Sequence, residues 1–269
     1  MNTFKTMKSG VLLMLLLCAG ALCADAPPAA PPPAPNPAVD PILDALDQRG
    51  KSLKEFTADV TMSTTDTSVG NTNTRLGHVL FQKKGDSGDA RMHVTFDSQV
   101  KKNGTKPMLM KYKLEYILND GVLLDYDFEK KLGTRRQVAQ PGQKVNLLKL
   151  GEGPFPLPIG QSKQDVHRNF IVSKIAPAPD DPPSSTHLQL KPIKGTSMAR
   201  HFSKIDIWVD PKSNMPVRID TLDATGSEER TTQFSNVQVN PQKRLTDADF
   251  LPPKIDEKTW NLHDEALKQ

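Results

Sequence analysis

Short runs in which apolar and polar side chains alternate constrain the fold of this chain more than any other feature. Each run is bounded by turns rich in Gly, Asn or Asp, which is the pattern of a half-buried antiparallel strand. About ten such runs occur, at residues 56–63, 76–81, 90–96, 111–117, 122–128, 170–175, 187–191, 205–209, 217–222 and 230–239. Because strand twist accumulates, a sheet of this size must curl or close, and a curled sheet has a concave side.

Two stretches with a helical pattern accompany the strands. At residues 41–50, apolar side chains fall on one helical face and Gly50 supplies a stop. Residues 145–150 favour a short helix, residues 151–160 form an apolar loop rich in proline and glycine, and residues 162–169 favour one or two helical turns. We expect the helices to lie over the concave side of the sheet.

Residues 1–24 have the features of a cleavable export signal. Lys5 and Lys8 precede an apolar run of about a dozen residues that ends in small residues, whereas a membrane-spanning helix needs about 20. Cleavage removes both cysteines, Cys18 and Cys23, so no disulfide is expected. Lipidation of one of these cysteines is the less favoured alternative, because leucine precedes each of them. We therefore expect export to the periplasm.

The segment after the signal is a linker. Residues 25–41 contain eight prolines, which favour an extended spacer, and we place the Pro/Ala-rich linker at residues 25–40. No second linker and no internal repeat follow, so residues 41–269 are predicted to form one domain. The chain has 35 Lys+Arg against 31 Asp+Glu. Such a nearly neutral protein lacks the long-range field that attracts nucleic acid.

The sequence contains none of the common motifs for catalysis or cofactor binding. None of the six histidines is spaced three to five residues from another, although His78 and His93 lie on neighbouring candidate strands. Asp125 and Asp127 share one strand face, which we expect to be the solvent side, opposite Leu124. A glycosidase that uses this acid pair is the less favoured alternative. We expect no enzymatic activity, no metal and no cofactor.

The distinctive part of the sequence is apolar. Four alternating sets are expected to share the concave face: Leu76 and Leu80; Met92, Val94 and Phe96; Tyr112, Leu114 and Tyr116; and Leu124, Tyr126 and Phe128. A few short helices cannot fill so large a concave surface, and an unfilled apolar hollow is a ligand site. Methionines, among them Met62, re-pack around guests of different shape. These features favour lipid as the guest.

The sequence resembles the LolA-like outer-membrane lipoprotein carriers over most of residues 41–253. After the opening helix, the resemblance lies in FTADV at 56–60, GHVLFQKK at 77–84, NDG at 119–121, LDYD at 124–127, LQLKP at 188–192, FSKIDIWVD at 202–210, MP at 215–216, TQF at 232–234 and DFLPP at 249–253. It implies an incomplete antiparallel barrel whose apolar cavity takes the acyl chains of a lipoprotein crossing the periplasm. It also implies that the first helix and residues 145–169 form a lid. Lys84-Gly85 stands where the family usually carries Arg-Pro.

Pattern and resemblance together predict a mainly β (α+β) fold, with one curved antiparallel sheet of about ten strands and short helices over an apolar cavity. The predicted function is that of a monomeric, non-catalytic carrier of lipoprotein acyl chains or another envelope lipid, which meets donor and acceptor proteins at the inner and outer membranes. The alternative is an envelope lipid sensor or scaffold that uses the same half-barrel to regulate a membrane partner. The residues predicted to line the cavity are Met62, Leu80, Met92, Val94, Phe96, Leu114, Tyr116, Leu124, Tyr126, Phe128, Leu147, Leu148 and Phe155.

Overall fold

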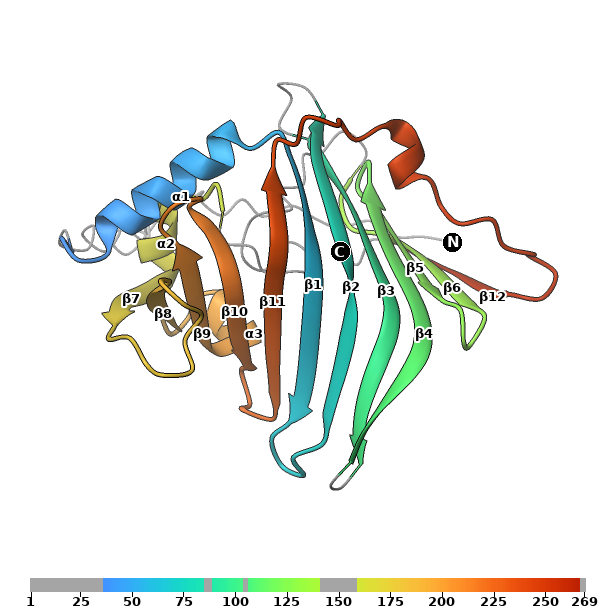
Figure 1. Cartoon of the computed structure of the whole chain (residues 1–269), viewed down its shortest axis with the longest axis horizontal. Coiled ribbons are helices and arrows are strands. Elements are labelled where there is room, and N and C mark those ends of the chain that lie inside the picture. The colour runs from blue at the N-terminus through green and yellow to red at the C-terminus, as the bar shows by residue number, and fades with distance from the viewer. Residues whose placement is uncertain (1–35, 85–88, 104–105, 141–158, 267–269) are drawn as a thin grey trace, which may run out of the picture. The chain divides into compact units, whose positions relative to one another are not determined.

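The described strands of the computed structural model form one sheet (Figure 1). The structure describes residues 36–84, 89–103, 106–140 and 159–266, which lie within the unit Pro32–Gln269. The strands are β1 (Glu55–Asp66), β2 (Thr72–Lys84), β3 (Asp89–Asn103), β4 (Lys106–Asn119), β5 (Val122–Asp127), β6 (Leu132–Gln137), β7 (Phe170–Ile175), β8 (Thr186–Pro192), β9 (Phe202–Asp210), β10 (Met215–Asp223), β11 (Glu228–Val239) and β12 (Asn261–Glu265). The helices are α1 (Asp40–Ser52), α2 (Lys163–Asn169), α3 (Met198–His201) and the 3₁₀ helix η2 (Asp247–Phe250).

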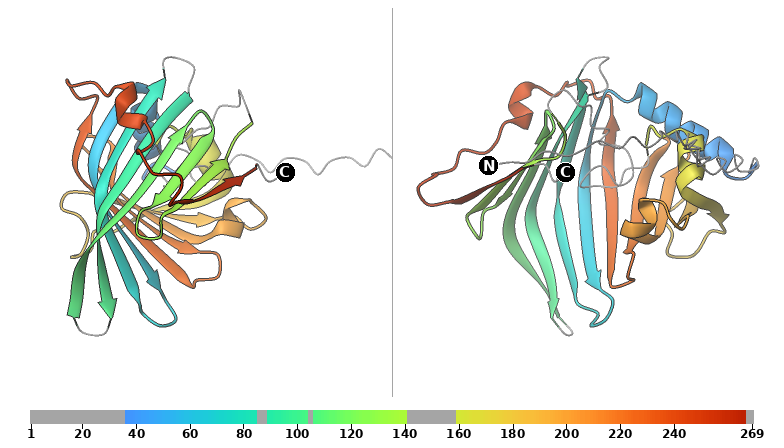
Figure 2. Two further views of the ribbon diagram at one scale, coloured as in Figure 1. Left: turned by 90° about the vertical axis from the view of Figure 1, so that its right-hand side faces the viewer. Right: turned by 180° about the vertical axis from the view of Figure 1, so that it is seen from behind.

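The order of strands across the sheet is β12-β6-β5-β4-β3-β2-β1-β11-β10-β9-β8-β7. Neighbours are antiparallel except β12 and β6, which are parallel. Figure 2 shows from the side that the sheet curves strongly, and β12 and β7 remain as its two edges. The predicted open curved sheet is therefore confirmed. The ten candidate strands coincide with β1–β5 and β7–β11, whereas β6 and β12 carry no alternating pattern.

Helix α1 turns its apolar side toward the sheet. Pro41 lies in the first turn, where a missing backbone N–H breaks no intrahelical bond, and Leu43 and Leu46 are buried. The helix runs to Ser52, so Gly50 does not stop it as predicted. Gly50 permits a close approach instead, because a Cβ there would lie 2.1 Å from the Cα of Gly160.

Helix α2 confirms the helical turns predicted at 162–169 and packs against α1. The hydroxyl of Ser162 caps it by accepting a hydrogen bond from the backbone N–H of Asp165. His167 Nε2 lies 2.9 Å from Asp40 Oδ1, which ties α2 to the start of α1. Both helices lie at the β7–β10 end of the sheet (Figures 1 and 2). The helix predicted at 145–150 lies outside the described residues.

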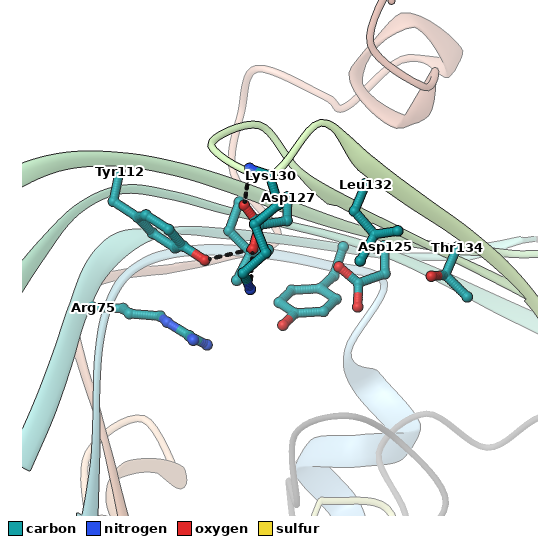
Figure 3. A pocket seen from close by; sticks show the side chains of 9 residues that line it. Arg75, Tyr112, Asp125, Asp127, Lys130, Leu132 and Thr134 are labelled. Atoms are coloured by element: carbon teal, nitrogen blue, oxygen red, sulfur yellow. Dashed lines mark hydrogen bonds and ion pairs between the residues drawn. The ribbon is translucent and has the colours of Figure 1, made fainter. Parts of the chain in front are cut away.

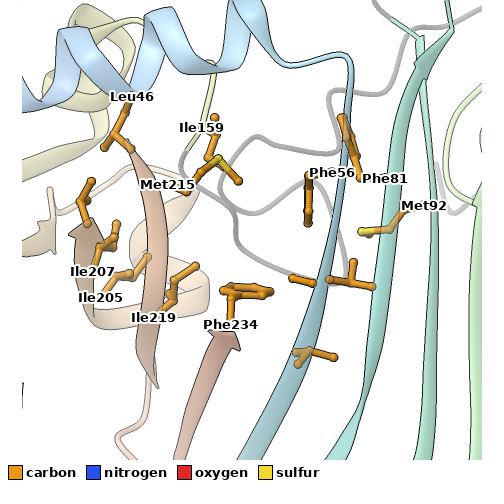
Figure 4. Close-up of a cluster of buried hydrophobic side chains, with 14 of the residues drawn as sticks. Leu46, Phe56, Phe81, Met92, Ile159, Ile205, Ile207, Met215, Ile219 and Phe234 are labelled. Carbon is orange, nitrogen blue, oxygen red and sulfur yellow. The ribbon is translucent and has the colours of Figure 1, made fainter. Parts of the chain in front are cut away.

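Side chains along each strand alternate between two faces of the sheet. We call the face that carries Phe56 and Val94 the inner face, and the opposite one the outer face. Buried apolar side chains of α1 and α2 join those of the inner face in one cluster that extends from β5 to β7 (Figure 4). The ladder between β2 and β3 shifts register between Leu76 and Gly77, where Asp97 of β3 is the extra residue without a partner on β2. Such a bulge bends a sheet and increases its twist.

Candidate functional site

Apolar side chains form continuous rows across the inner face. Strand pairing places Phe56, Phe81, Met92, Leu118 and Leu123 side by side from β1 to β5, and all five are buried. The rings of Phe56 and Phe81 stack with centroids 5.3 Å apart. This row lies beside the region that α1 covers (Figure 4).

Two further rows begin apolar and end polar. One runs through Ala58, Val79, Val94, Tyr116 and Asp125, from β1 to β5. The side chains of the first three are buried, whereas Tyr116 and Asp125 are half-buried. The inner face therefore changes from apolar to polar toward β5.

The third row shows the same change one step further along the strands. It runs through Val60, Gly77, Phe96, Leu114 and Asp127, and it ends in a buried carboxylate. Because opposite residues of an antiparallel pair share a face, Asp125 and Asp127 belong to the inner face. Their expected place on the solvent side is wrong.

The structure divides the residues predicted to line one cavity between both faces of the sheet. On the inner face are Met62, Met92, Val94, Phe96, Leu114 and Tyr116. On the outer face are Leu80, Leu124, Tyr126 and Phe128. Outside the described residues are Leu147, Leu148 and Phe155. The expectation that the four alternating sets share one face is therefore wrong for the sets of β2 and β5.

Tyr126 of β5 and Phe128, which directly follows this strand, lie on the outer face but are covered by another part of the chain. The indole ring of Trp260 meets the rings of Tyr126 and Phe128 edge to face, with centroids 5.9 Å and 5.1 Å apart. Lys113 Nζ lies 4.1 Å from the centroid of Phe128 on the same face. A lone tryptophan close to the C-terminus was the sequence signal for this second layer.

On β2, the inner face carries Val79 and Phe81 in place of the predicted Leu76 and Leu80. Both valine and phenylalanine are buried, whereas Leu76 is exposed. Along β2, Leu76 and Leu80 point to one face, whereas Val79 and Phe81 point to the other, so apolar side chains occupy both faces. Alternation alone therefore does not assign the faces of this strand.

A polar pocket of about 170 Å³ opens where the two mixed rows end (Figure 3). We define it by its lining residues, which come from β2, β4, β5, β6 and the turn between the last two. They are Arg75, Tyr112, Leu114, Tyr116, Asp125, Asp127, Lys130, Leu132 and Thr134. The pattern of single strands did not reveal the pocket, because its residues meet only through the ladder.

Asp127 is fully engaged at one side of the polar pocket. Its carboxylate accepts hydrogen bonds from the Tyr112 hydroxyl at 2.9 Å and from Lys130 Nζ at 2.8 Å. Burial raises the pKa of Asp127, but the hydrogen bonds from Lys130 and Tyr112 outweigh it, so the pKa lies below its ordinary value. Burial, followed by the bond to Asp127, raises the pKa of Tyr112 to about 12.

No group of three metal-ligating side chains occurs among the described residues. His78 and His93 both lie on the outer face, but each has its own acid: His78 contacts Asp59 at 2.6 Å, and His93 contacts Glu115 at 3.6 Å. None of the helices in the described part of the chain is long and apolar enough to cross a membrane.

Comparison with known proteins finds likenesses of fold only. No protein-family model matches the sequence, and no curated protein sequence matches it. Similar solved structures include a DUF1329 family protein from Desulfovibrio piger, with 14% identity, a TM-score of 0.40, and coverage of 80% of this chain and 96% of that one. A LolA superfamily protein from Nitrosomonas europaea has 13% identity, a TM-score of 0.30 and coverage of 79% and 96%. LprF from Mycobacterium bovis has 11% identity, a TM-score of 0.39, and coverage of 78% of this chain and 96% of that one. One of these structures is thus named as a member of the LolA superfamily, which the sequence resembles.

Proposed function

We propose that this protein is a non-catalytic carrier in the periplasm that binds acyl chains of lipoproteins or other envelope lipids against its inner face. The observation that carries the proposal is the set of three rows on the inner side of an open sheet. One row is apolar from β1 to β5, and the other two are apolar over β1–β3 and end in a carboxylate on β5. The described helices α1 and α2 lie at the other end of that sheet (Figures 1 and 2). An apolar concave surface of this kind suits a long aliphatic guest.

Burial of methylene groups alone provides the affinity that such a carrier needs. Each buried methylene contributes about 0.8 kcal/mol, so a chain of about a dozen contributes on the order of 10 kcal/mol before the cost of immobilising it. No hydrogen bond to the chain is required. Because an apolar face does not discriminate strongly between chains of similar length, the proposal concerns a class of lipids.

Native mass spectrometry of the exported protein after gentle purification tests the proposal. We expect a co-purifying mass that organic extraction identifies as a lipid or an acylated peptide. Leu114 on the inner face of β4 and Leu124 on the outer face of β5 form a matched pair for substitution. We expect Leu114→Gln to retain about tenfold less lipid, which corresponds to a loss of about 1.4 kcal/mol. Leu124→Gln should retain the wild-type amount.

Stability must be measured beside retention, because a buried glutamine also weakens the fold. Far-UV circular dichroism at the temperature of the lipid assay shows whether each variant is folded. A folded Leu114→Gln variant with undiminished lipid, or equal losses in both variants, would contradict binding at the inner face. A wild-type protein that acquires no lipid from vesicles and carries none after purification would refute the carrier.

A further inference from the structure

The polar pocket contains two charged side chains for which the described residues provide no ion-pair partner. No ion pair within the described residues engages the Asp125 carboxylate or the Arg75 guanidinium, and the one hydrogen bond of Arg75 goes to a neutral group, the Tyr116 hydroxyl. In Figure 3 no dashed line reaches Asp125 or Arg75. The Arg75 guanidinium also lies over the Tyr112 ring, with Cζ 5.7 Å from the centroid. Arg75 Nε is buried and donates to no acceptor.

The other charges of the pocket are already neutralised. Asp127 binds Lys130, as described above, and Arg136, whose guanidinium lies near Asp125, binds Glu265 at 2.6 Å. The two unpaired charges, Arg75 on β2 and Asp125 on β5, therefore remain as one positive and one negative group in the same small hollow.

Partial burial makes these unpaired charges costly. The pKa of Asp125 lies above its ordinary value, because the raising effect of burial is larger than the lowering effect of the neighbouring Arg136 guanidinium. A half-buried charge without a partner lowers the stability of a protein, so such groups are typical of binding sites rather than of structural cores. A ligand with an anion for Arg75 and a cation for Asp125 would remove both costs.

Two neutral hydroxyls also line the pocket, that of Tyr116 and that of Thr134. Burial raises the pKa of Tyr116, so this hydroxyl stays protonated and able to donate a hydrogen bond. Thr134 on β6 provides a second hydroxyl in the pocket, beside Asp125 (Figure 3). A guanidinium together with hydroxyl donors is a common arrangement for phosphate oxygens.

We infer that the polar pocket binds a phosphoethanolamine group, with the phosphate at Arg75 and the primary ammonium at Asp125. Leu114 lines the pocket and also belongs to a row that is apolar from Val60 to that point. A phosphoethanolamine lipid can therefore place its headgroup in the pocket while its acyl chains lie along the rows. This inference rests on the proposed carrier function and names the substrate class as phospholipids with a zwitterionic headgroup.

Lipid retention from mixed vesicles tests the inference. The purified protein is freed of lipid, incubated with vesicles of equal parts phosphatidylethanolamine and phosphatidylglycerol with the same acyl chains, and analysed by native mass spectrometry. We expect wild-type protein to retain phosphatidylethanolamine in about tenfold excess, as one charge-assisted hydrogen bond provides. Asp125→Asn should bring the ratio close to one, because the amide cannot pair with the ammonium. Asp97→Asn, at an exposed position of β3, is the matched control and should keep the wild-type ratio.

Arg75 has a separate expected effect, because both lipids contain a phosphate. Arg75→Gln should lower retention of both lipids by about tenfold, and Arg75→Lys should restore part of it, because lysine keeps the charge but loses the fork of donors. Retention of both lipids at the wild-type level by Arg75→Gln would overturn the assignment of the phosphate to this residue.

Failure of the inference and failure of the carrier function give different results. Equal retention of both lipids by the wild type overturns the headgroup assignment and leaves the carrier intact. No retention of either lipid refutes the carrier. In that case, calorimetric titration with free O-phosphoethanolamine tests the pocket alone. Binding that Asp125→Asn abolishes supports the pocket for the free compound, and absence of binding overturns the inference.

Discussion

Replacement of Gly77 by alanine tests the close approach of β2 and β3 at the bulge between them. Gly77 lies in an apolar row beside Phe96, at the point where the ladder shifts register. A Cβ at this position would lie 1.8 Å from the carbonyl oxygen of Thr95 and 2.7 Å from the Cα of Phe96. Both atoms belong to the backbone, so no side-chain rotation relieves the clash. The two strands must move apart by more than about 1 Å, because non-bonded heavy atoms approach to about 3.5 Å.

The cost of that movement follows from the bonds it breaks. Separation of the strands at Gly77 weakens about two ladder hydrogen bonds, each worth about 1 kcal/mol when made and about 1–3 kcal/mol when its groups are left buried and unpaired. It also displaces Phe96, which is fully buried. We expect a loss of about 3–5 kcal/mol and, at about 2–4 °C per kcal/mol for a domain of this size, a fall in Tm of roughly 6–20 °C.

Thermal unfolding followed by far-UV circular dichroism measures this change, with Gly70→Ala as the control. Gly70 also lies in this half of the sheet, in the turn between β1 and β2, but with a φ of +71° and open space around it. Its replacement should cost only the roughly 1 kcal/mol of a left-handed alanine. If Gly77→Ala destabilises the protein no more than Gly70→Ala, the close approach of β2 and β3 does not exist as described.

Three further substitutions address the groups that hold the rest of the fold. Burial raises the pKa of Glu55, but hydrogen bonds led by the one from Gln82 outweigh it and lower the pKa below 4.5. The stability that Glu55 provides is therefore present above pH 4.5 and is lost as the pH falls through the folded pKa. Glu55→Gln should lower the free energy of unfolding in urea by about 2–4 kcal/mol at pH 7. Burial lowers the pKa of His93, but contacts led by Glu115 outweigh it and raise the pKa above 6.5. The stability that His93 provides is therefore present below pH 6.5 and is lost as the pH rises through the folded pKa. His93→Gln should flatten the pH dependence of the urea midpoint in this pH range. Trp260→Ala should release β12, seen as faster proteolysis of residues 251–266 with the rest of the sheet intact.

The strands that the sequence predicted are those in which local pattern and tertiary position agree. β5 begins after Asp120 and Gly121, whose φ angles of +50° and +72° are those of the hairpin turn that an Asp-Gly pair favours. β6 and β12 escaped prediction because pairing alone defines them. β6 has Leu132 as its single large apolar residue, and all five residues of β12 are exposed. Periodicity reports burial, and a strand with no buried row gives no periodic signal.

The candidate site was harder to predict than the fold because it depends on which face of each strand turns inward. For β3 and β4 one face is plainly apolar, and Met92, Val94, Phe96 and Leu114 are on the inner face as expected. For β5 both faces contain apolar side chains, and the choice depends on Trp260, which is far away in the sequence. A shift of one residue inverts every side chain of a strand. The sequence therefore placed two of the acids that line the polar pocket, Asp125 and Asp127, on the wrong face.

The two edges of the sheet explain how a surface with so many apolar rows stays open without inviting other strands. β12 is short and exposed, and its acids pair with the arginines of β6: Glu265 with Arg136 at 2.6 Å and Asp264 with Arg135 at 3.8 Å. At the other edge, β7 is six residues long and exposes Lys174. Short edge strands with charged side chains disfavour pairing with other chains. Because no ladder among the described strands joins the two edges, the curvature of the sheet can change without the loss of backbone hydrogen bonds, whereas a closed barrel has a fixed radius. In the proposed carrier, an open sheet of this kind would suit acyl chains of different number and length, and the polar pocket would provide the selectivity that the apolar rows lack.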